Sequence, residues 1–505
     1  MTMIPEQAPL PEPPREAAQA YWPTSKQLVA LLAGYFALQV FLRVISSNSV
    51  DLDESEAVVL SQKFSWGYAT DPPLYIWLQM LLFRVFGTSV LALSLLKNLL
   101  LFSTYVLTFA TARLVTRSPV AGVAAALSLF YIPSIAWESQ RDLTHSVLSA
   151  TLSVATLFSF LKLQDTRGLR WYIGFGLCAG FGCISKFNYV LWLLGLLLAG
   201  FVLNATRSAL LNPRLLLSAG IALLIFLPSG LWMLENRDLA LLTSSKLEFK
   251  QSLSWIQVTG LGLKNLVQSM ISFTAPLSLI YLLLFSRAPA RMAPPAAERP
   301  AYRQLIFTSW AIIGFVLVLL VVFARATGFK ERWFQPILVM LPIAAVALVQ
   351  ARLDPLRLKW ITGLTLVVMV AVATVMPGRL LVAERLKREE PLTRPYAQIA
   401  KAIRPLVPPD SLLLCDSKLL AGNLRLGTLH ATQLYIELLP LFRTNYTHCF
   451  LVWDARRNDA PPDHLSLWAE AHGARGPTPT KPRFFTESYR YHRSKVFRIG
   501  CLQLY

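Results

Sequence analysis

Repeated apolar segments constrain this chain more than any other feature of its 505 residues. With 54% hydrophobic residues, 15% charged residues and a mean hydropathy of +0.49, the chain has more apolar surface than a water-soluble core requires. A helix needs roughly 20 residues to cross a bilayer. The sequence predicts a polytopic α-helical membrane protein with about 11–13 transmembrane helices. Eleven apolar runs carry this prediction, at about 27–46, 90–112, 119–137, 145–162, 171–186, 188–204, 214–233, 264–286, 306–324, 334–350 and 357–377.

The distribution of basic residues gives these segments an orientation. The formal net charge is +20, but Lys and Arg stand in short clusters between the apolar runs and form no continuous patch, which argues against nucleic-acid binding. With a cytoplasmic N-terminus, clusters at 113–117, 162–170, 207–214, 287–303 and 352–359 all fall on the cytoplasmic side, as the positive-inside rule requires. We therefore expect a multi-pass protein of the bacterial inner membrane.

The two ends of the chain differ in composition from the centre. Residues 1–26 are Pro-rich and lack the apolar stretch of a signal peptide, so we expect a disordered cytoplasmic tail. Residues 27–377 form the predicted transmembrane module. In 378–505, short runs such as "SLLLCD", "HCFLVWDA" and "KVFRIGCLQLY" alternate with helical stretches, which predicts a small periplasmic α/β domain. Whether Cys415, Cys449 and Cys501 form a disulfide there stays open.

The predicted first outer loop, residues 47–88, collects carboxylates. Asp51, Asp53, Glu54 and Glu56 lie within six positions, in "DLDESE", and Asp71 follows. In extended backbone Asp51 and Asp53 point the same way, so with Asp71 they could hold a divalent metal ion. One of the acids could instead accept a proton from a hydroxyl group. A third interpretation is that the acids simply begin a helix.

The second half of this loop carries helix and interface signals. Pro72-Pro73 favours a helix that starts there and ends at Gly87, too short to span comfortably. Two helices joined by an acidic turn would form a platform at the bilayer surface. Aromatic residues such as Tyr68 could stack on sugar rings or anchor the loop among lipid head groups.

Five stretches, in this order over roughly residues 30–350, resemble the GT-C superfamily of polyprenyl-phosphate-sugar-dependent glycosyltransferases. This group includes glycosyltransferase family 39, the protein O-mannosyltransferase-like enzymes, and the aminoarabinose transferase acting on lipid A. The stretches are Asp53-Glu54 with "DPPLYIWL" (71–78), "RDLTHSVL" (141–148), "CISKFNYVLWLLG" (183–195), "LPSGLWMLENRD" (227–238) and "FKERWFQPILVMLPIAAV" (329–346). The resemblance implies inverting transfer of a sugar from a polyprenyl-phosphate donor to lipid A or lipopolysaccharide, another glycolipid, a polysaccharide or a protein, at the periplasmic face.

The resemblance also implies roles for single residues. The catalytic acids fall on Asp53, Glu54 and Asp142, with Asp53 favoured as the base. Further substrate-binding candidates are the loop residues Asp51, Glu56, Tyr68 and Asp71 and the cations Arg141, Lys186, Lys330 and Arg332, which would stabilise charge on the leaving phosphate.

Each cation also has a structural alternative. Lys186 could snorkel from a helix end, Arg332 could pair with Glu331, and Arg141 could pair with Glu138 or Asp142. Some relatives carry a basic residue or His where this chain has Asp71, so a phosphate contact from that position is in doubt. The need for a metal ion stays open.

Two other function classes compete with an enzyme. A transporter or flippase for a lipid-linked sugar would also use an acidic outer loop, but it favours ionisable residues or broken helices near the middle of the membrane. A receptor or scaffold would bind a partner through its outer domain and would not require the five ordered stretches.

Overall fold

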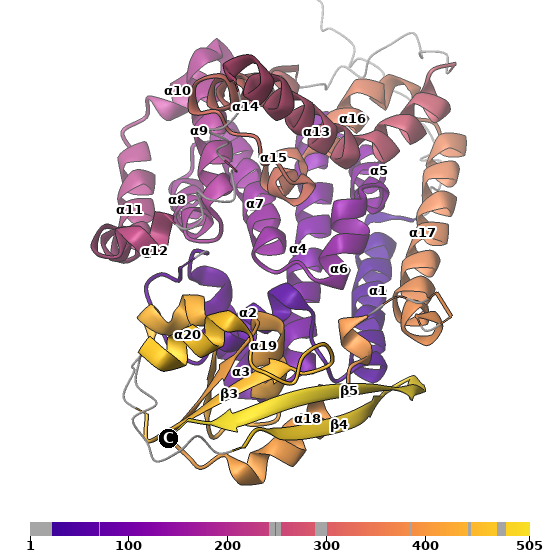
Figure 1. Ribbon diagram of the computed structural model, residues 1–505. Coiled ribbons are helices and arrows are strands. Elements are labelled where there is room, and N and C mark those ends of the chain that lie inside the picture. The colour runs from indigo at the N-terminus through magenta and orange to yellow at the C-terminus, as the bar shows by residue number, and fades with distance from the viewer. Residues whose placement is uncertain are drawn as a thin grey trace, which may run out of the picture.

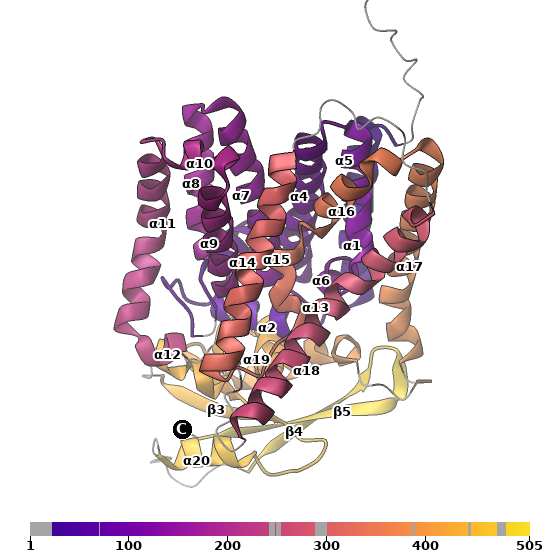
Figure 2. The same cartoon turned by 90° about the horizontal axis from the view of Figure 1, so that it is seen from above.

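The computed structural model describes residues 23–69, 71–241, 248, 254–287, 300–383, 385, 386, 388, 390–442, 446–471 and 481–504. Long helices form a bundle that stands on one side of a smaller sheet domain (Figure 1). The view turned by 90° shows the same two parts, with the sheet domain across one end of the bundle (Figure 2). Of the tail predicted at 1–26, residues 1–22 lie outside the described residues.

The bundle consists of long helices and a few short turns between them. The longer elements are α1 (Ser25–Ser46), α4 (Val90–Thr116), α5 (Pro119–Ser128), α7 (His145–Thr166), α8 (Leu169–Cys183), α9 (Phe187–Val202), α11 (Leu215–Glu235), α13 (Trp255–Phe285), α14 (Pro300–Ala324), α16 (Leu341–Val349) and α17 (Pro355–Val382). Helices α10 (Asn204–Leu210) and α12 (Arg237–Leu241) have only seven and five residues. The short ones are η1 (Leu129–Tyr131), η2 (Ser134–Glu138), α6 (Ser139–Arg141), η4 (Glu331–Phe334), α15 (Gln335–Leu338) and η5 (Gln350–Arg352).

Seven of the described helices are long and apolar enough to cross a membrane, and the number is ten if three bent helix pairs each count as one span. Every one of the eleven predicted runs coincides with a helix or a bent pair, although α8 has only 15 residues. Large apolar side chains point outward from the bundle, such as Leu216 at 77% and Phe323 at 78% exposure. Because such a surface is stable only among lipid chains, the protein is a multi-pass membrane protein.

The carboxylate-rich loop folds into two helices at the sheet end of the bundle. Helix α2 (Leu52–Leu60) begins directly after Asp51, and α3 (Leu74–Phe86) starts after Pro73 and ends at Gly87. Gly87 has a φ of 69°, a backbone conformation that suits glycine. The predicted helix between the two prolines and Gly87 is therefore confirmed, and the loop acids do begin a helix.

The C-terminal region forms a five-stranded mixed sheet with strand order β2-β1-β3-β5-β4. β1 pairs in parallel with both β2 and β3, whereas β5 is antiparallel to β3 and β4. The predicted strands are found as β1, β3 and β5. The elements are η6 (Pro391–Thr393), α18 (Tyr396–Ile403), η7 (Arg404–Leu406), β1 (Ser411–Cys415), α19 (Lys418–Arg425), β2 (Thr432–Leu434), η8 (Ile436–Leu441), β3 (His448–Asp454), α20 (Asp463–Ala471), β4 (Arg483–Tyr489) and β5 (His492–Gln503).

The loop helices and the sheet domain share one hydrophobic core. Tyr68, Tyr75 and Ile76 of the loop belong to the same buried cluster as Leu413 of β1 and Leu424 of α19. All five cysteines lie among the described residues and are free thiols. The sheet domain is therefore held to the loop by packing.

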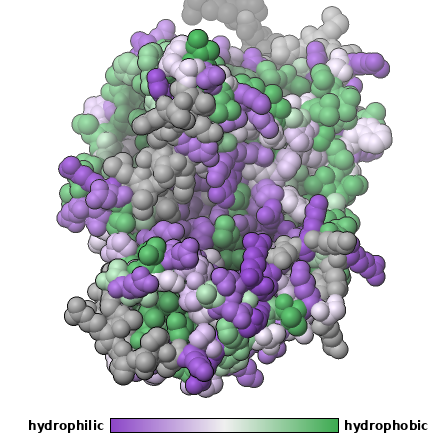
Figure 3. Space-filling model, viewed as in Figure 1, coloured by the Kyte–Doolittle hydropathy of each residue, from purple (hydrophilic) through white to green (hydrophobic). Residues whose placement is uncertain are grey.

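The close approach of helix α19 to helix α2 fixes the position of the sheet domain relative to the acidic loop. A Cβ atom on Gly422 of α19 would lie 2.4 Å from the carbonyl oxygen of Ser55, so only glycine fits where α19 crosses α2. Hydrophilic residues gather between the bundle and the sheet domain on the face seen in Figure 3. The acidic loop thus lies between the two parts of the molecule.

Candidate active site

The start of α2 fixes the backbone of the acidic loop. The Asp51 carboxylate accepts a hydrogen bond from the Leu52 N–H at 3.0 Å. The Glu54 side chain reaches back to the Asp51 N–H at 3.4 Å, and the Asp51 side chain faces the Glu54 backbone N–H, which together form a capping box. Burial raises the pKa of Asp51, and Glu54 adds to this, whereas Arg141 and Arg379 act in the opposite direction. Asp51 is therefore used to begin the helix.

Glu54 is buried between two cations. Its Oε1 accepts a hydrogen bond from Lys97 Nζ of α4 at 2.7 Å, and its Oε2 accepts one from Arg43 Nη2 of α1 at 2.9 Å. The side chains of Glu54 and Lys97 are each only 2% exposed. Burial alone would raise the pKa of Glu54, but Lys97 and Arg43 outweigh it and lower the pKa to about 2. Glu54 therefore stays ionised and ties the loop to two bundle helices.

Asp53 has different surroundings, although it is the neighbouring residue. Its N–H donates to Asp142 Oδ1 at 2.8 Å, and its Oδ2 lies 3.4 Å from Arg332 Nη1. The Asp53 side chain is 20% exposed and that of Arg332 is 39% exposed. Burial, followed by the charge of Asp53, raises the pKa of Asp142 to about 7. The structure thus brings together Asp53, Asp142 and Arg332, three of the predicted site residues.

The remaining predicted cations occupy varied positions. Lys186 donates to the Ser146 hydroxyl, which fixes its ammonium group at the start of α7. Arg141 lies 3.4 Å from Glu138, and both are more than 40% exposed, so the predicted Arg141–Glu138 pair is present. Arg332 contacts Asp53, which differs from the alternative pairing with Glu331. Lys330 is exposed just before η4.

Two further loop candidates, Tyr68 and Asp71, take different positions. Tyr68 is 2% exposed and its hydroxyl donates to the Lys63 carbonyl at 2.7 Å, so its ring forms part of the core. Asp71 lies close enough to raise the pKa of Lys418 of α19. Among the described residues, no group of three His, Cys, Asp or Glu side chains is placed to hold a metal ion. Asp51, Asp53 and Asp71 therefore do not assemble the site that extended backbone predicted, because residues 52–60 are helical.

The sheet domain contributes residues that the sequence did not predict. Lys418 donates to Glu56 Oε2 at 2.9 Å, and the Tyr435 hydroxyl donates to Glu56 Oε1 at 3.2 Å. Burial alone would lower the pKa of Lys418, but Glu56, Asp53 and Asp71 raise it, which places its ammonium group beside the acidic loop. No local pattern marks Lys418, because it lies 362 positions from Glu56 in the sequence and meets it only in the folded chain.

Asn423 of α19 holds the backbone just before α2. Its Oδ1 accepts from the Val50 N–H at 2.8 Å, and its Nδ2 donates to the Val50 carbonyl at 2.9 Å.

By contrast, a signal for Lys97 did exist, since a lysine inside an apolar run is costly and needs a partner. The site therefore draws on α1, α2, α4, α19 and the segments around Asp142 and Arg332.

Comparison with known proteins identifies the family. The chain is 32% identical over 453 residues to the lipopolysaccharide core galacturonosyltransferase RgtB of Rhizobium johnstonii, covering 88% of this chain and 91% of that protein. The chain belongs to the GT-C superfamily of membrane glycosyltransferases. Lipopolysaccharide core galacturonosyltransferase RgtA of the same organism is 32% identical over 331 residues, which is 65% of each chain. As a GT-C member, this protein is a glycosyltransferase.

Two further comparisons agree with this placement. The family model for dolichyl-phosphate-mannose-protein mannosyltransferases matches residues 70–232 of this GT-C glycosyltransferase. The crystal structure of ArnT from Cupriavidus metallidurans bound to undecaprenyl phosphate has a TM-score of 0.59 and 14% sequence identity, covering 95% of this chain and 98% of that one. At that identity the likeness concerns the fold.

Proposed function

We propose that this glycosyltransferase moves a sugar from a polyprenyl-phosphate donor to a lipopolysaccharide core acceptor, with inversion at the anomeric carbon, at the periplasmic face of the inner membrane. The observation that carries the proposal is the position of Asp53. Its carboxylate is partly exposed, lies beside Asp142 and is 3.4 Å from Arg332. A carboxylate beside a cation suits glycosyl transfer. The carboxylate can take the proton of the acceptor hydroxyl, and the cation can stabilise the negative charge on the leaving phosphate.

Asp53 acts as the general base in this mechanism. It accepts the proton of the acceptor hydroxyl as that oxygen forms the new bond to the anomeric carbon. The bond from the anomeric carbon to the phosphate oxygen breaks, and the electron pair stays on the leaving polyprenyl phosphate. Arg332, with Lys330 and Lys186, stabilises that charge. Asp142 is largely protonated below pH 7 and so limits repulsion with Asp53.

Glu54 and Asp51 support this reaction by fixing the backbone of the loop that carries Asp53. Glu54 is 1% exposed and bound to two cations, which leaves it no access to a substrate. Asp51 caps α2. We assign them positioning roles. Glu56, bound by Lys418 and Tyr435, holds the sheet domain to the loop, Asp71 faces the same lysine, and Tyr68 belongs to the core.

The names of the relatives support a proposal for the substrates. RgtB and RgtA are named as lipopolysaccharide core galacturonosyltransferases, and ArnT was crystallised with undecaprenyl phosphate. We therefore propose galacturonic acid as the sugar and undecaprenyl phosphate as its carrier. The 32% identity over 88% of this chain and 91% of RgtB supports transfer of the relative's substrate class to this chain.

The charge distribution supports the proposed orientation. Arg113, Arg117 and Arg167 lie at or just after the ends of α4 and α7, away from the acidic loop at the start of α2. By the positive-inside rule that end belongs in the cytoplasm. The acidic loop and the domain at 378–505 then face the periplasm, with the module at 27–377 in the membrane.

The experiment uses the full chain, purified in detergent with undecaprenyl-phosphate galacturonic acid and isolated lipopolysaccharide core. Mass spectrometry should find an acceptor heavier by one hexuronosyl residue and free undecaprenyl phosphate in equal amount. Detergent solution has no compartments, so a flippase would give no product. A transfer rate equal to that of a protein-free control would refute the proposal.

A further inference from the structure

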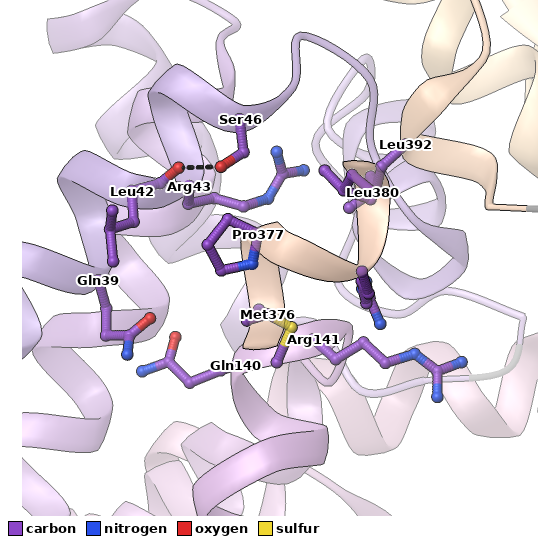
Figure 4. A pocket seen from close by; sticks show the side chains of 11 residues that line it. Gln39, Leu42, Arg43, Ser46, Gln140, Arg141, Met376, Pro377, Leu380 and Leu392 are labelled. Carbon is purple, nitrogen blue, oxygen red and sulfur yellow. Dashed lines mark hydrogen bonds between the residues drawn. The ribbon is translucent and has the colours of Figure 1, made fainter. Parts of the chain in front are cut away.

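A second cationic site lies beside the acidic loop, between α17 and the segment around α6. It is a cavity of about 690 Å³, and its described lining includes Arg141, Arg379 and Arg388 with a single acid, Glu390. A narrower inner part, of about 30 Å³, continues from Arg141 and Arg379 to Arg43 and Gln39 of α1. Figure 4 shows this inner part, where Gln39 and Arg43 face Met376 and Pro377 of α17, with Gln140 and Arg141 on its other side.

Buried donors in this cavity lack acceptors within the described part of the chain. Gln39 Nε2, Arg43 Nε and Arg379 Nε are all buried without a hydrogen-bond partner there. Gln39 is only 4% exposed, and the Arg379 side chain is 14% exposed, with an ion-pair partner among the described residues, Glu390, at the long distance of 3.9 Å. A buried donor without an acceptor costs free energy. In a binding site, such donors obtain their acceptor from the bound ligand. All three atoms are donors, which calls for a ligand rich in oxygen.

The wall of the cavity changes from cationic to apolar toward the bilayer. Val375, Val382 and Leu386 line it and are 51%, 39% and 59% exposed. Val375 continues an apolar row on α17 that includes Val367 and Val370, both more than 60% exposed, whereas Val382 and Leu386 follow Arg379 in the chain. A ligand with an acidic head and an apolar tail would find a matching surface for each part.

The cavity lies beside Asp51, whereas Arg332 lies beside Asp53. Helix α17 packs on α1 and α5, whereas η4, which carries Arg332, packs on α13 and on α15, which contacts α7 and α9. Arg141 directly precedes Asp142, and both Arg141 and Arg379 act on Asp51 electrostatically. Inversion requires the acceptor oxygen to approach the anomeric carbon from the side opposite the leaving group. Cations on two flanks therefore suit two acidic lipids, one on each side.

We propose that the cavity between α1, α6 and α17 binds the acidic head group of the acceptor lipid, phosphate or carboxylate, through Arg379 and Arg141. This rests on the proposed function, since it requires a donor phosphate on the Arg332 flank. Arg379 and Arg141 recognise charge on the acceptor and take no part in proton transfer. The inner donors Gln39 Nε2 and Arg43 Nε bind oxygen atoms of the same group directly or through one water, for which the 30 Å³ has room.

The test is the steady-state kinetics of Arg379→Gln with two acceptors, intact lipopolysaccharide core lipid and the same lipid after removal of its phosphates and esterification of its carboxylates. We expect KM for the intact acceptor to rise roughly tenfold or more, as loss of a charge-assisted contact does. The KM for the donor and kcat should stay unchanged, and the neutralised acceptor should show no difference between variant and wild type. Arg379→Lys should recover part of the loss.

Arg352→Gln serves as the matched control, because Arg352 lies in η5 beyond α16 and donates to the Phe285 carbonyl, at 3.5 Å. It should leave all three constants unchanged. An equal rise in KM for the donor would assign the cavity to the donor and overturn the proposal. Unchanged KM for the intact acceptor in an active, normally folded Arg379→Gln protein would also overturn it. Failure of the proposed function is distinct, since the wild-type protein would then transfer nothing.

Discussion

Two neighbouring carboxylates on α2 occupy contrasting regions of the molecule. Glu54 turns into the bundle, where Lys97 and Arg43 bind both of its oxygens and its side chain is 2% exposed. Asp53 turns toward the space between bundle and sheet domain, is 20% exposed, and has a single cation at 3.4 Å. Adjacent acids of one motif therefore have different roles. The fully paired Glu54 fixes the loop, and the partly paired Asp53 can exchange a proton.

The strongest test of this division is Asp53→Asn. An amide cannot accept the acceptor's proton, so we expect the transfer rate in purified protein to fall roughly 10²- to 10⁴-fold, with little change in thermal unfolding. Asp354→Asn is the control, because Asp354 caps α17 at the other end of the bundle and asparagine caps equally well. Near-normal transfer by Asp53→Asn would contradict its role as the base.

Glu54→Gln should show the reverse pattern. Removing this charge leaves Lys97 and Arg43 buried without a counter-ion, which costs about 3–5 kcal/mol of unfolding free energy. We expect a clearly lower unfolding temperature in detergent and poor yield. The double variant Glu54→Gln/Lys97→Met removes the stranded charge and should regain part of the stability. If Glu54→Gln unfolds like the wild type yet is inactive, Glu54 and not Asp53 carries the chemistry.

Much of this arrangement could be predicted from sequence because it depends on local patterns. Apolar runs of about 20 residues predicted the helices, and Pro72-Pro73 with Gly87 predicted the limits of α3. The triad of Glu54, Lys97 and Arg43 joins three helices, and Asn423 and Lys418 meet the loop across more than 360 residues. Such contacts depend on how elements pack, and no spacing in one sequence encodes them.

The junction between sheet domain and α2 offers a smaller effect. In Gly422→Ala the added methyl would lie 2.4 Å from the Ser55 carbonyl oxygen, so α19 must shift away from α2. Overpacking of this kind costs about 1–3 kcal/mol. We expect a lower unfolding temperature and a moderate loss of transfer. Gly314→Ala in α14 has open space around its Cβ and should unfold no more easily than wild type. Equal behaviour of the two variants would show that the domain does not position the loop.

Asp142 gives the smallest predicted effect, which is a dependence of the unfolding free energy on pH. Its pKa in the folded protein is about 7, above the ordinary value near 3.8, so between those pH values the folded state binds more protons than the unfolded one. Stability should therefore fall as the pH rises from about 4 to about 7, with a slope of at most one proton because a single carboxyl group titrates. Thermal unfolding across this range measures the slope. Asp142→Asn should lack this component while Asp354→Asn keeps it, and an unchanged slope in Asp142→Asn would assign the raised pKa to another acid.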